Sequence, residues 1–228
     1  MAKTSPSATL VDTFGRVARD LRVSLTDRCN LRCTYCMPAE GMEWLPTQKV
    51  LSDAEISRLL SIAVRDLGIT KIRFTGGEPL LRKGLEEIVG AASQLRTSDG
   101  QRPELTLTTN ALGLERRAKK LAAAGLDRVN ISLDSLDKER YAKLARRDRL
   151  PDVLAGIEAA AAAGLVPVKI NAVIMPDTNE ADILPLARFA LAGGHQLRFI
   201  EQMPLGPRDA WKREQLVTQQ EILDILGS

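Results

Sequence analysis

Short runs in which hydrophobic and polar residues alternate recur along the chain and predict six β-strands. In the first run, Leu21, Val23 and Leu25 alternate with polar residues. A period of two is typical of a strand with one buried face. The predicted strands cover Asp20–Thr26, Lys71–Thr75, Glu104–Thr108, Arg128–Leu133, Val166–Ile174 and Gln196–Glu201.

Stretches with helical periodicity lie between these strands. The first begins at Ser52, where Glu55 completes a capping box, and it stops at Gly68. The others cover Lys83–Leu95, Glu115–Ala124, Asp152–Ala163, Glu180–Leu191 and Gln219–Leu226. Alternating strands and helices indicate a parallel sheet. An antiparallel sheet with one wet face would give the same alternation in its strands and is the alternative.

The polar positions of the strands predict the shape of the sheet. Because side chains alternate between the two faces, one face is apolar and needs helices to cover it. The other face is polar and cationic, and it carries Arg22, Arg73 and Lys169. Six strand–helix units fall short of the eight that close a full barrel. We therefore expect an α/β fold, an incomplete (β/α)6 TIM-like barrel of parallel strands. It would form one domain over residues 9–228, after a flexible N-terminus at residues 1–8.

Composition narrows the classes of partner. The chain has 228 residues, 44% of them hydrophobic, and its 32 basic and 29 acidic residues give a net charge of +3. This balance predicts neither a nucleic-acid nor a membrane partner. The basic run at residues 146–149 is expected to be a solvated loop. No apolar run is long enough to span a bilayer and the start lacks a secretory signal, so a cytoplasmic location is expected.

The three cysteines, Cys29, Cys33 and Cys36, all lie within eight residues, directly after the first predicted strand. In a reducing compartment such thiols are metal ligands more often than disulfide partners. Three cysteines can hold three irons of a four-iron cluster and leave the fourth iron open. Two alternatives stay open. One is a zinc site completed by His195, and the other is a set of core thiols on one face of a helix.

The stretch CNLRCTYC also resembles the signature of the radical S-adenosylmethionine enzymes. More narrowly, five blocks in order resemble the GTP 3′,8-cyclase family, over a range from about Asp12 to the end of the chain. These blocks read DLRVSLTDRCNLRCTYCMP, KIRFTGGEPLLR, LTTNA, VNISLDSLD and RFIEQMP. The resemblance implies a lyase that converts GTP to (8S)-3′,8-cyclo-7,8-dihydroguanosine 5′-triphosphate, the first step of molybdenum cofactor biosynthesis.

The resemblance also implies roles for individual residues. Cys29, Cys33 and Cys36 would hold a [4Fe-4S] cluster, whose open iron would bind the methionine part of S-adenosylmethionine. The residues implied to contact S-adenosylmethionine are Tyr35, Gly77, Glu78, Ser132 and Met203, with Glu78 facing its ammonium group. Those implied to bind GTP are Arg22, Arg73, Thr108 and Lys169. Buried cations without partners are costly, so a polyanion is a natural partner for this set.

The end of the sequence bears on the substrate. Family members carry a C-terminal segment with three more cysteines, which bind a second cluster that contacts guanine. No cysteine follows Cys36 here. Two other functions therefore stay open: a single-cluster radical enzyme with another substrate, such as a peptide, and a non-catalytic module that binds zinc or a cluster. The implied partners are GTP, an electron donor and the next enzyme of the pathway, which forms cyclic pyranopterin phosphate. Self-association into a homodimer is left open.

Overall fold

The computed structural model describes residues 9–203 and 216–227 and contains a six-stranded parallel sheet. The strands are β1 (Asp20–Ser24), β2 (Lys71–Thr75), β3 (Glu104–Thr109), β4 (Arg128–Ser132), β5 (Lys169–Ile174) and β6 (Gln196–Glu201). They lie side by side in chain order, and every neighbouring pair is parallel. The predicted incomplete parallel barrel is confirmed, and the antiparallel alternative is wrong. The expectation for residues 1–8 lies outside the described residues.

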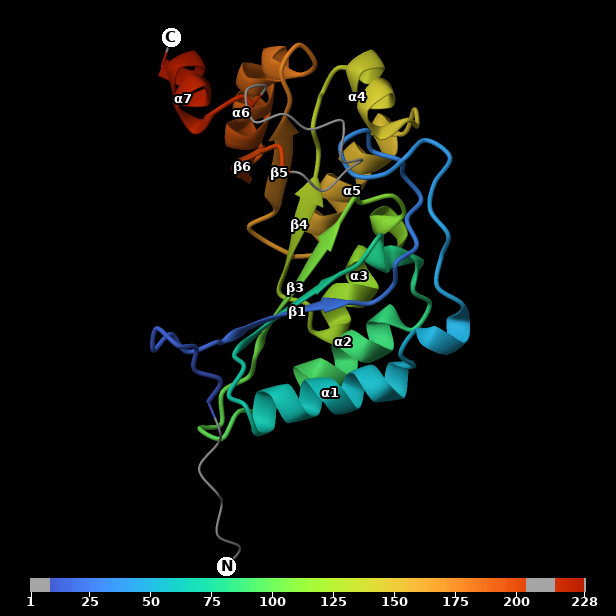
Figure 1. Cartoon of the computed structure of the whole chain (residues 1–228), viewed down its shortest axis with the longest axis vertical. Coiled ribbons are helices and arrows are strands. Elements are labelled where there is room, and N and C mark those ends of the chain that lie inside the picture. The colour runs from blue at the N-terminus through green and yellow to red at the C-terminus, as the bar shows by residue number, and fades with distance from the viewer. Residues whose placement is uncertain (1–8, 204–215, 228) are drawn as a thin grey trace, which may run out of the picture.

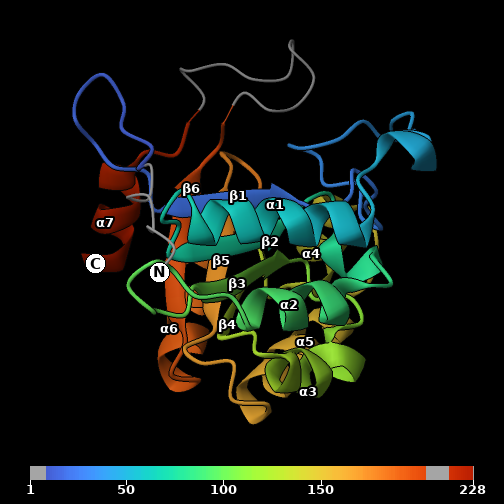
Figure 2. The ribbon, with the colours of Figure 1, turned by 90° about the horizontal axis from the view of Figure 1, so that it is seen from below.

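The helices lie where the apolar face of the sheet needs cover. They are α1 (Asp53–Arg65), α2 (Leu85–Ser93), α3 (Leu114–Ala124), α4 (Lys138–Ala145), α5 (Leu150–Ala162), α6 (Ile183–Ala192) and α7 (Gln219–Gly227). Figures 1 and 2 show α1, α2, α3 and α5 together on one side of the sheet. Ile72, Phe74 and Leu107 are fully buried beneath this layer. Their burial removes apolar surface from water, which is the main stabilising contribution of such a core.

The ends of the helices follow the local chemistry of the sequence. The Ser52 side chain accepts a hydrogen bond from the Glu55 amide at 3.3 Å, and the Glu55 carboxylate accepts one from the Ser52 amide at 2.8 Å. This is the predicted capping box. Helix α3 ends at Gly125, whose φ of 104° suits glycine.

Several predicted boundaries were wrong by a few residues. β5 begins at Lys169 rather than Val166, and the intervening Pro167 has no backbone N–H to donate to a sheet. The helix predicted from Glu180 opens as a 3₁₀ turn (Glu180–Asp182) before α6 begins. Helix α4 was missed because it is short and half of its eight residues are charged. Its start is marked by Asp137, whose side chain accepts a hydrogen bond from the Arg140 amide at 2.9 Å.

Candidate functional site

The cysteine loop, defined here as residues 29–36, leaves the carboxyl end of β1 and contains no helix. Two backbone hydrogen bonds tie it to the end of α4, from the Arg32 amide to the Ala145 carbonyl (3.2 Å) and from the Thr34 amide to the Leu144 carbonyl (2.9 Å). The alternative of core thiols on a helix is therefore wrong. The loop is an irregular segment that the protein backbone itself fixes in place.

Arg146 provides a further hold on the loop. Its guanidinium donates to the Met37 carbonyl at 3.0 Å and to the Arg32 carbonyl at 3.3 Å. Arg146 has a φ of 52°, an uncommon backbone conformation for a residue other than glycine. Residues 146–149 form an exposed loop between α4 and α5, as predicted, and the Arg146 side chain also closes the cysteine loop from the α4 side.

The three thiols interact electrostatically, which places them near one another. Burial raises the pKa of Cys33 to about 12, and Asp134 and the other two thiols add to this shift. Burial also raises the pKa of Cys29 and Cys36, and the charge of Cys36 adds to the shift of Cys29. A bound metal would reverse this preference, because coordination stabilises the thiolate.

All three side-chain donors that the sequence predicts are thiols, the usual ligands of iron–sulfur clusters. Within residues 9–203 and 216–227, no three His, Cys, Asp or Glu side chains are grouped so as to hold one metal ion. In a cluster each thiolate binds a different iron, so its ligands surround a larger body. The zinc alternative needed His195, which comes just before β6, at the amino ends of the parallel strands. The cysteines follow the opposite, carboxyl end of β1, so the structure does not bring that site together.

The turn after β2 packs backbone to backbone against residues 26–28, which lead into the cysteine loop. The Gly77 amide donates to the Thr26 carbonyl and the Glu78 amide to the Arg28 carbonyl, both at 2.7 Å. A Cβ atom on Gly77 would overlap the Asp27 and Arg28 carbonyl oxygens. Glycine is therefore required here by close approach. The contact of Gly77 with S-adenosylmethionine stays a prediction.

Glu78 joins this turn to the end of β3. Its side chain is 1% exposed, and its carboxylate accepts hydrogen bonds from the Leu80 amide (2.9 Å), the Thr109 hydroxyl (2.6 Å) and the Asn110 amide (2.7 Å). Burial raises the pKa of Glu78, and these hydrogen bonds oppose that rise. These three donors satisfy most of the acceptor positions of the carboxylate, and its contact with the ammonium of S-adenosylmethionine stays a prediction.

Sequence reasoning gave no role to Asn110, which lies beside the first cysteine. Its side-chain amide donates to the Asn30 side-chain oxygen at 2.7 Å and lies 4.0 Å from the Cys29 sulfur. Asn110 belongs to the LTTNA block at the carboxyl end of β3. Its place after a strand was the available signal, because side chains at these strand ends meet at one edge of a parallel sheet.

Asp134 is a second residue that was given no role. The Tyr35 hydroxyl donates to its carboxylate at 2.8 Å, and the Val173 amide donates to the other oxygen at 2.9 Å. Burial raises the pKa of Asp134 to about 6. These contacts attach the end of the cysteine loop to the segment that follows β4 and to β5. Ser132 lies two residues earlier, half-buried, and Met203, after β6, is 54% exposed.

The predicted GTP-binding residues lie on the polar face of the sheet. Arg22 and Arg73 are register partners on β1 and β2. Thr108 on β3 accepts a hydrogen bond from Asn130 at 3.3 Å, and Asn130 is the register partner of Lys169. The structure thus brings all four predicted residues onto one face, below the cysteine loop.

This face carries positive charge that acidic side chains do not balance. Burial lowers the pKa of Lys169, and repulsion from Arg128, Arg198 and Arg73 adds to that shift. The Arg73 Nε is buried and has no hydrogen-bond partner. Glu104 pairs with Arg128 and, at 4.0 Å, with Lys71. Within the described part of the chain no ion pair reaches Arg22, Arg73 or Lys169.

A site of this kind, with an all-thiol loop at the carboxyl end of a partial barrel, matches a known family. The family model described as Radical SAM superfamily matches residues 23–190, and the chain belongs to that superfamily. The solved structure of methylornithine synthase is similar with a TM-score of 0.67 at 12% identity, over 91% of this chain and 60% of that one. At this identity the likeness shows the fold alone.

Two curated relatives are much closer in sequence. GTP 3′,8-cyclase of Corynebacterium glutamicum (strain R) is 68% identical over 94% of this chain and 57% of its own length. GTP 3′,8-cyclase of Mycolicibacterium smegmatis is 59% identical over 95% of this chain and 59% of its own length. The chain thus spans less than two thirds of these relatives. Across the described residues, no helix is both long and apolar enough to cross a bilayer.

Proposed function

We propose that this chain is the radical core of a GTP 3′,8-cyclase and that its cationic sheet face binds the triphosphate of GTP. The observation that carries the proposal is the set of unpaired cations Arg22, Arg73 and Lys169 beneath the cysteine loop. Unpaired cations gathered on one face attract a ligand of opposite charge, and the buried Arg73 Nε needs a hydrogen-bond acceptor that such a ligand can provide. The names of the curated relatives support GTP as that ligand.

The cysteine loop would hold one [4Fe-4S] cluster through Cys29, Cys33 and Cys36. When bound, the cluster and S-adenosylmethionine supply a one-electron cleavage of a carbon–sulfur bond, which yields the radical that abstracts hydrogen. The chain contributes the position of these groups. Glu78 would accept a hydrogen bond from the ammonium of S-adenosylmethionine, with Gly77 allowing close approach. Tyr35, Ser132 and Met203 complete the proposed cofactor contacts.

The substrate would lie along the strands, with its triphosphate toward the middle of the sheet. Arg22, Arg73 and Lys169 would bind phosphate oxygens, and Thr108 would add a hydroxyl donor. This arrangement holds the ribose nearer the cysteine loop than the triphosphate. Holding a substrate in a reactive orientation lowers the entropic part of the activation barrier, and this can contribute several kcal/mol to catalysis. The reaction would be the lyase reaction that forms (8S)-3′,8-cyclo-7,8-dihydroguanosine 5′-triphosphate.

The remaining parts of the proposal follow from this reaction. It would be the first step of molybdenum cofactor biosynthesis in the cytoplasm and would consume one electron from a donor. Its product would be the substrate of the enzyme that forms cyclic pyranopterin phosphate. Residues 9–228 would act as one domain.

The test is anaerobic reconstitution of the chain with iron and sulfide, followed by S-adenosylmethionine and dithionite. We expect about four irons per chain, because one cubane has four. We also expect 5′-deoxyadenosine in an amount that GTP increases. Release stimulated by a peptide but not by GTP would favour another radical enzyme. Zinc without iron or sulfide would favour a non-catalytic module.

A further inference from the structure

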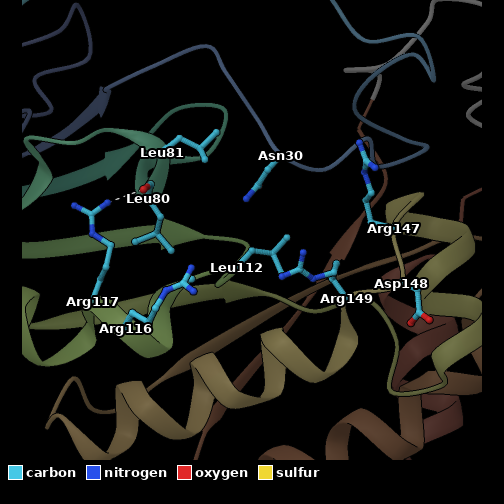
Figure 3. Close-up of a pocket in the computed structure, with 10 residues that line it drawn as sticks. Asn30, Leu80, Leu81, Leu112, Arg116, Arg117, Arg147, Asp148 and Arg149 are labelled. Atoms are coloured by element: carbon cyan, nitrogen blue, oxygen red, sulfur yellow. Dashed lines mark hydrogen bonds between the residues drawn. The ribbon is translucent and has the colours of Figure 1, made fainter.

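A second charged feature lies outside the polar face of the sheet. A cavity of about 510 Å³ opens between the cysteine loop and the helix layer. Its lining comes from Asn30, from the turn after β2, from the start of α3 and from the loop between α4 and α5. Figure 3 shows Asn30 on one side and the arginines of α3 on the other. The function proposed above gives this cavity no role.

The cavity keeps a positive charge after the charged lining residues that form ion pairs with neighbouring side chains are discounted. Arg117 donates to Glu86 at 2.8 Å, Arg149 pairs with Asp152 at 2.7 Å, and Asp148 pairs with Lys138 at 3.3 Å. Arg116 and Arg147 are exposed, and neither has an ion pair within the described residues.

These two arginines add positive charge around a partly apolar floor. Leu81, also in the lining, is a large apolar side chain that is 44% exposed. The unpaired cations around this side chain give the cavity the charge that complements an acidic protein.

The cavity borders the cysteine loop directly, and the residues that join the two do not lie on the polar face of the sheet. Asn30 lines it and directly follows Cys29. The Asn110 side chain donates to Asn30 at 2.7 Å and lies 4.0 Å from the Cys29 sulfur. Arg146, adjacent to Arg147, holds the loop carbonyls of Met37 and Arg32. A partner seated in this cavity would therefore lie beside a proposed cluster ligand.

We propose that the cavity lined by Arg116 and Arg147 docks a small acidic protein that carries one electron at low potential. The proposal rests on the radical function above, which consumes one electron that the chain does not supply. In this step the carrier is oxidised by one electron and the iron–sulfur cluster is reduced by one. No covalent bond forms or breaks. Because GTP would occupy the polar face, the electron enters from the opposite side of the cysteine loop.

The test compares the double variant R116E/R147E with the matched control R58E/R188E. Arg58 and Arg188 are exposed on α1 and α6, outside the cavity lining. The probe is a bacterial flavodoxin. Titration calorimetry at low ionic strength measures binding of its oxidised form to the chain without a cluster. Stopped-flow absorbance follows reduction of the reconstituted chain by its reduced form, freed of other reductant, and separately by dithionite.

We expect R116E/R147E to weaken flavodoxin binding and to slow reduction by flavodoxin, each by about tenfold, since reversal of rim charges acts mainly on association. Both effects should shrink at high salt. Reduction by dithionite, a small reductant that needs no docking, should be unchanged, and so should R58E/R188E throughout.

Equal effects of the two double variants on flavodoxin binding would overturn the proposal. So would unchanged reduction by flavodoxin in R116E/R147E. Failure of the radical function itself would be seen separately, as absence of a cluster or of 5′-deoxyadenosine with dithionite. The binding measurement needs no cluster and still decides whether the cavity docks an acidic carrier.

Discussion

The cysteine loop and the cationic face of the sheet differ in how far their polar and charged groups find partners within the protein. The loop is held by Arg146, by the Tyr35–Asp134 hydrogen bond and by backbone bonds to α4. On the cationic face, by contrast, the Arg73 Nε has no partner, and desolvation together with repulsion from neighbouring arginines lowers the pKa of Lys169. The comparison indicates that the cofactor end is built in advance and that the substrate end is completed by its ligand.

The largest expected effect comes from removing a cluster ligand. Cys33→Ser should reduce bound iron to background after reconstitution and abolish 5′-deoxyadenosine, because an alcohol is a poor ligand for an iron–sulfur cluster. Iron and sulfide analysis measures the first effect and chromatography the second. The far-ultraviolet circular dichroism should not change, since the loop contains no helix. A Cys33→Ser chain that still held its full complement of iron would contradict the ligand assignment.

The next effect tests whether the cofactor end is held by the protein. Glu78→Ala should lower the free energy of unfolding of the metal-free chain by about 3 kcal/mol, because three buried donors lose their acceptor. Urea denaturation measures this. Glu87→Ala, at an exposed position of α2, is the matched control and should change stability by less than about 0.5 kcal/mol. Equal losses of unfolding free energy in the two variants would show that the Glu78 hydrogen bonds do not stabilise the contact between the turn after β2 and the end of β3.

A smaller effect separates two tyrosines. Tyr35→Phe should cost about 2 kcal/mol of unfolding free energy, because the buried Asp134 loses a hydrogen bond to its carboxylate. Tyr141→Phe is the control, since the Tyr141 hydroxyl is buried without a partner, and its loss should be neutral or stabilising. Thermal unfolding of the metal-free chains at pH 7.5 provides both values. The reverse order of stability would contradict the role given to Tyr35.

The smallest expected effect has opposite signs in the free and bound chain. Lys169→Met should weaken GTP binding about tenfold, a loss of about 1.4 kcal/mol. The same change should stabilise the ligand-free chain, because it removes a partly desolvated charge that repels Arg128 and Arg198.

The pH dependence of stability distinguishes this account of Lys169. A lysine whose folded pKa lies below its unfolded value binds more protons when unfolded. The wild-type chain should therefore gain stability relative to Lys169→Met as pH rises from the lowered pKa toward 10.5, its ordinary value. A difference in unfolding free energy that stays constant across that pH range would mean that folding does not lower the pKa of Lys169.

The alternation of residues along the strands made the fold predictable. Leu21, Val23 and Leu25 set one face and Arg22 the other, so the sequence carried both the sheet and its cationic side. Helix α4 was not found in this way, because its apolar face consists of only Tyr141, Leu144 and Ala145 in an eight-residue segment that carries four charges. Its start depends on a cap at Asp137 and its place on contacts with the distant cysteine loop.

The candidate site was predictable where a residue type determines the chemistry. The spacing of Cys29, Cys33 and Cys36 indicated a cluster without any structure. Asn110 and Asp134 were not predictable in role, because their partners lie about 80 to 100 residues away in sequence. Such contacts follow from the order of strands in the sheet, which the alternation of residues does not specify.

The central claim, that a polyphosphate completes the cationic face, is tested most directly by binding. Equilibrium dialysis would compare guanosine, GMP and GTP on the wild-type chain and on Lys169→Met. The account predicts affinity that rises with each phosphate, falls with salt, and gains less from the phosphates in the variant. Equal affinity for guanosine and GTP, or no GTP binding at all, would contradict it.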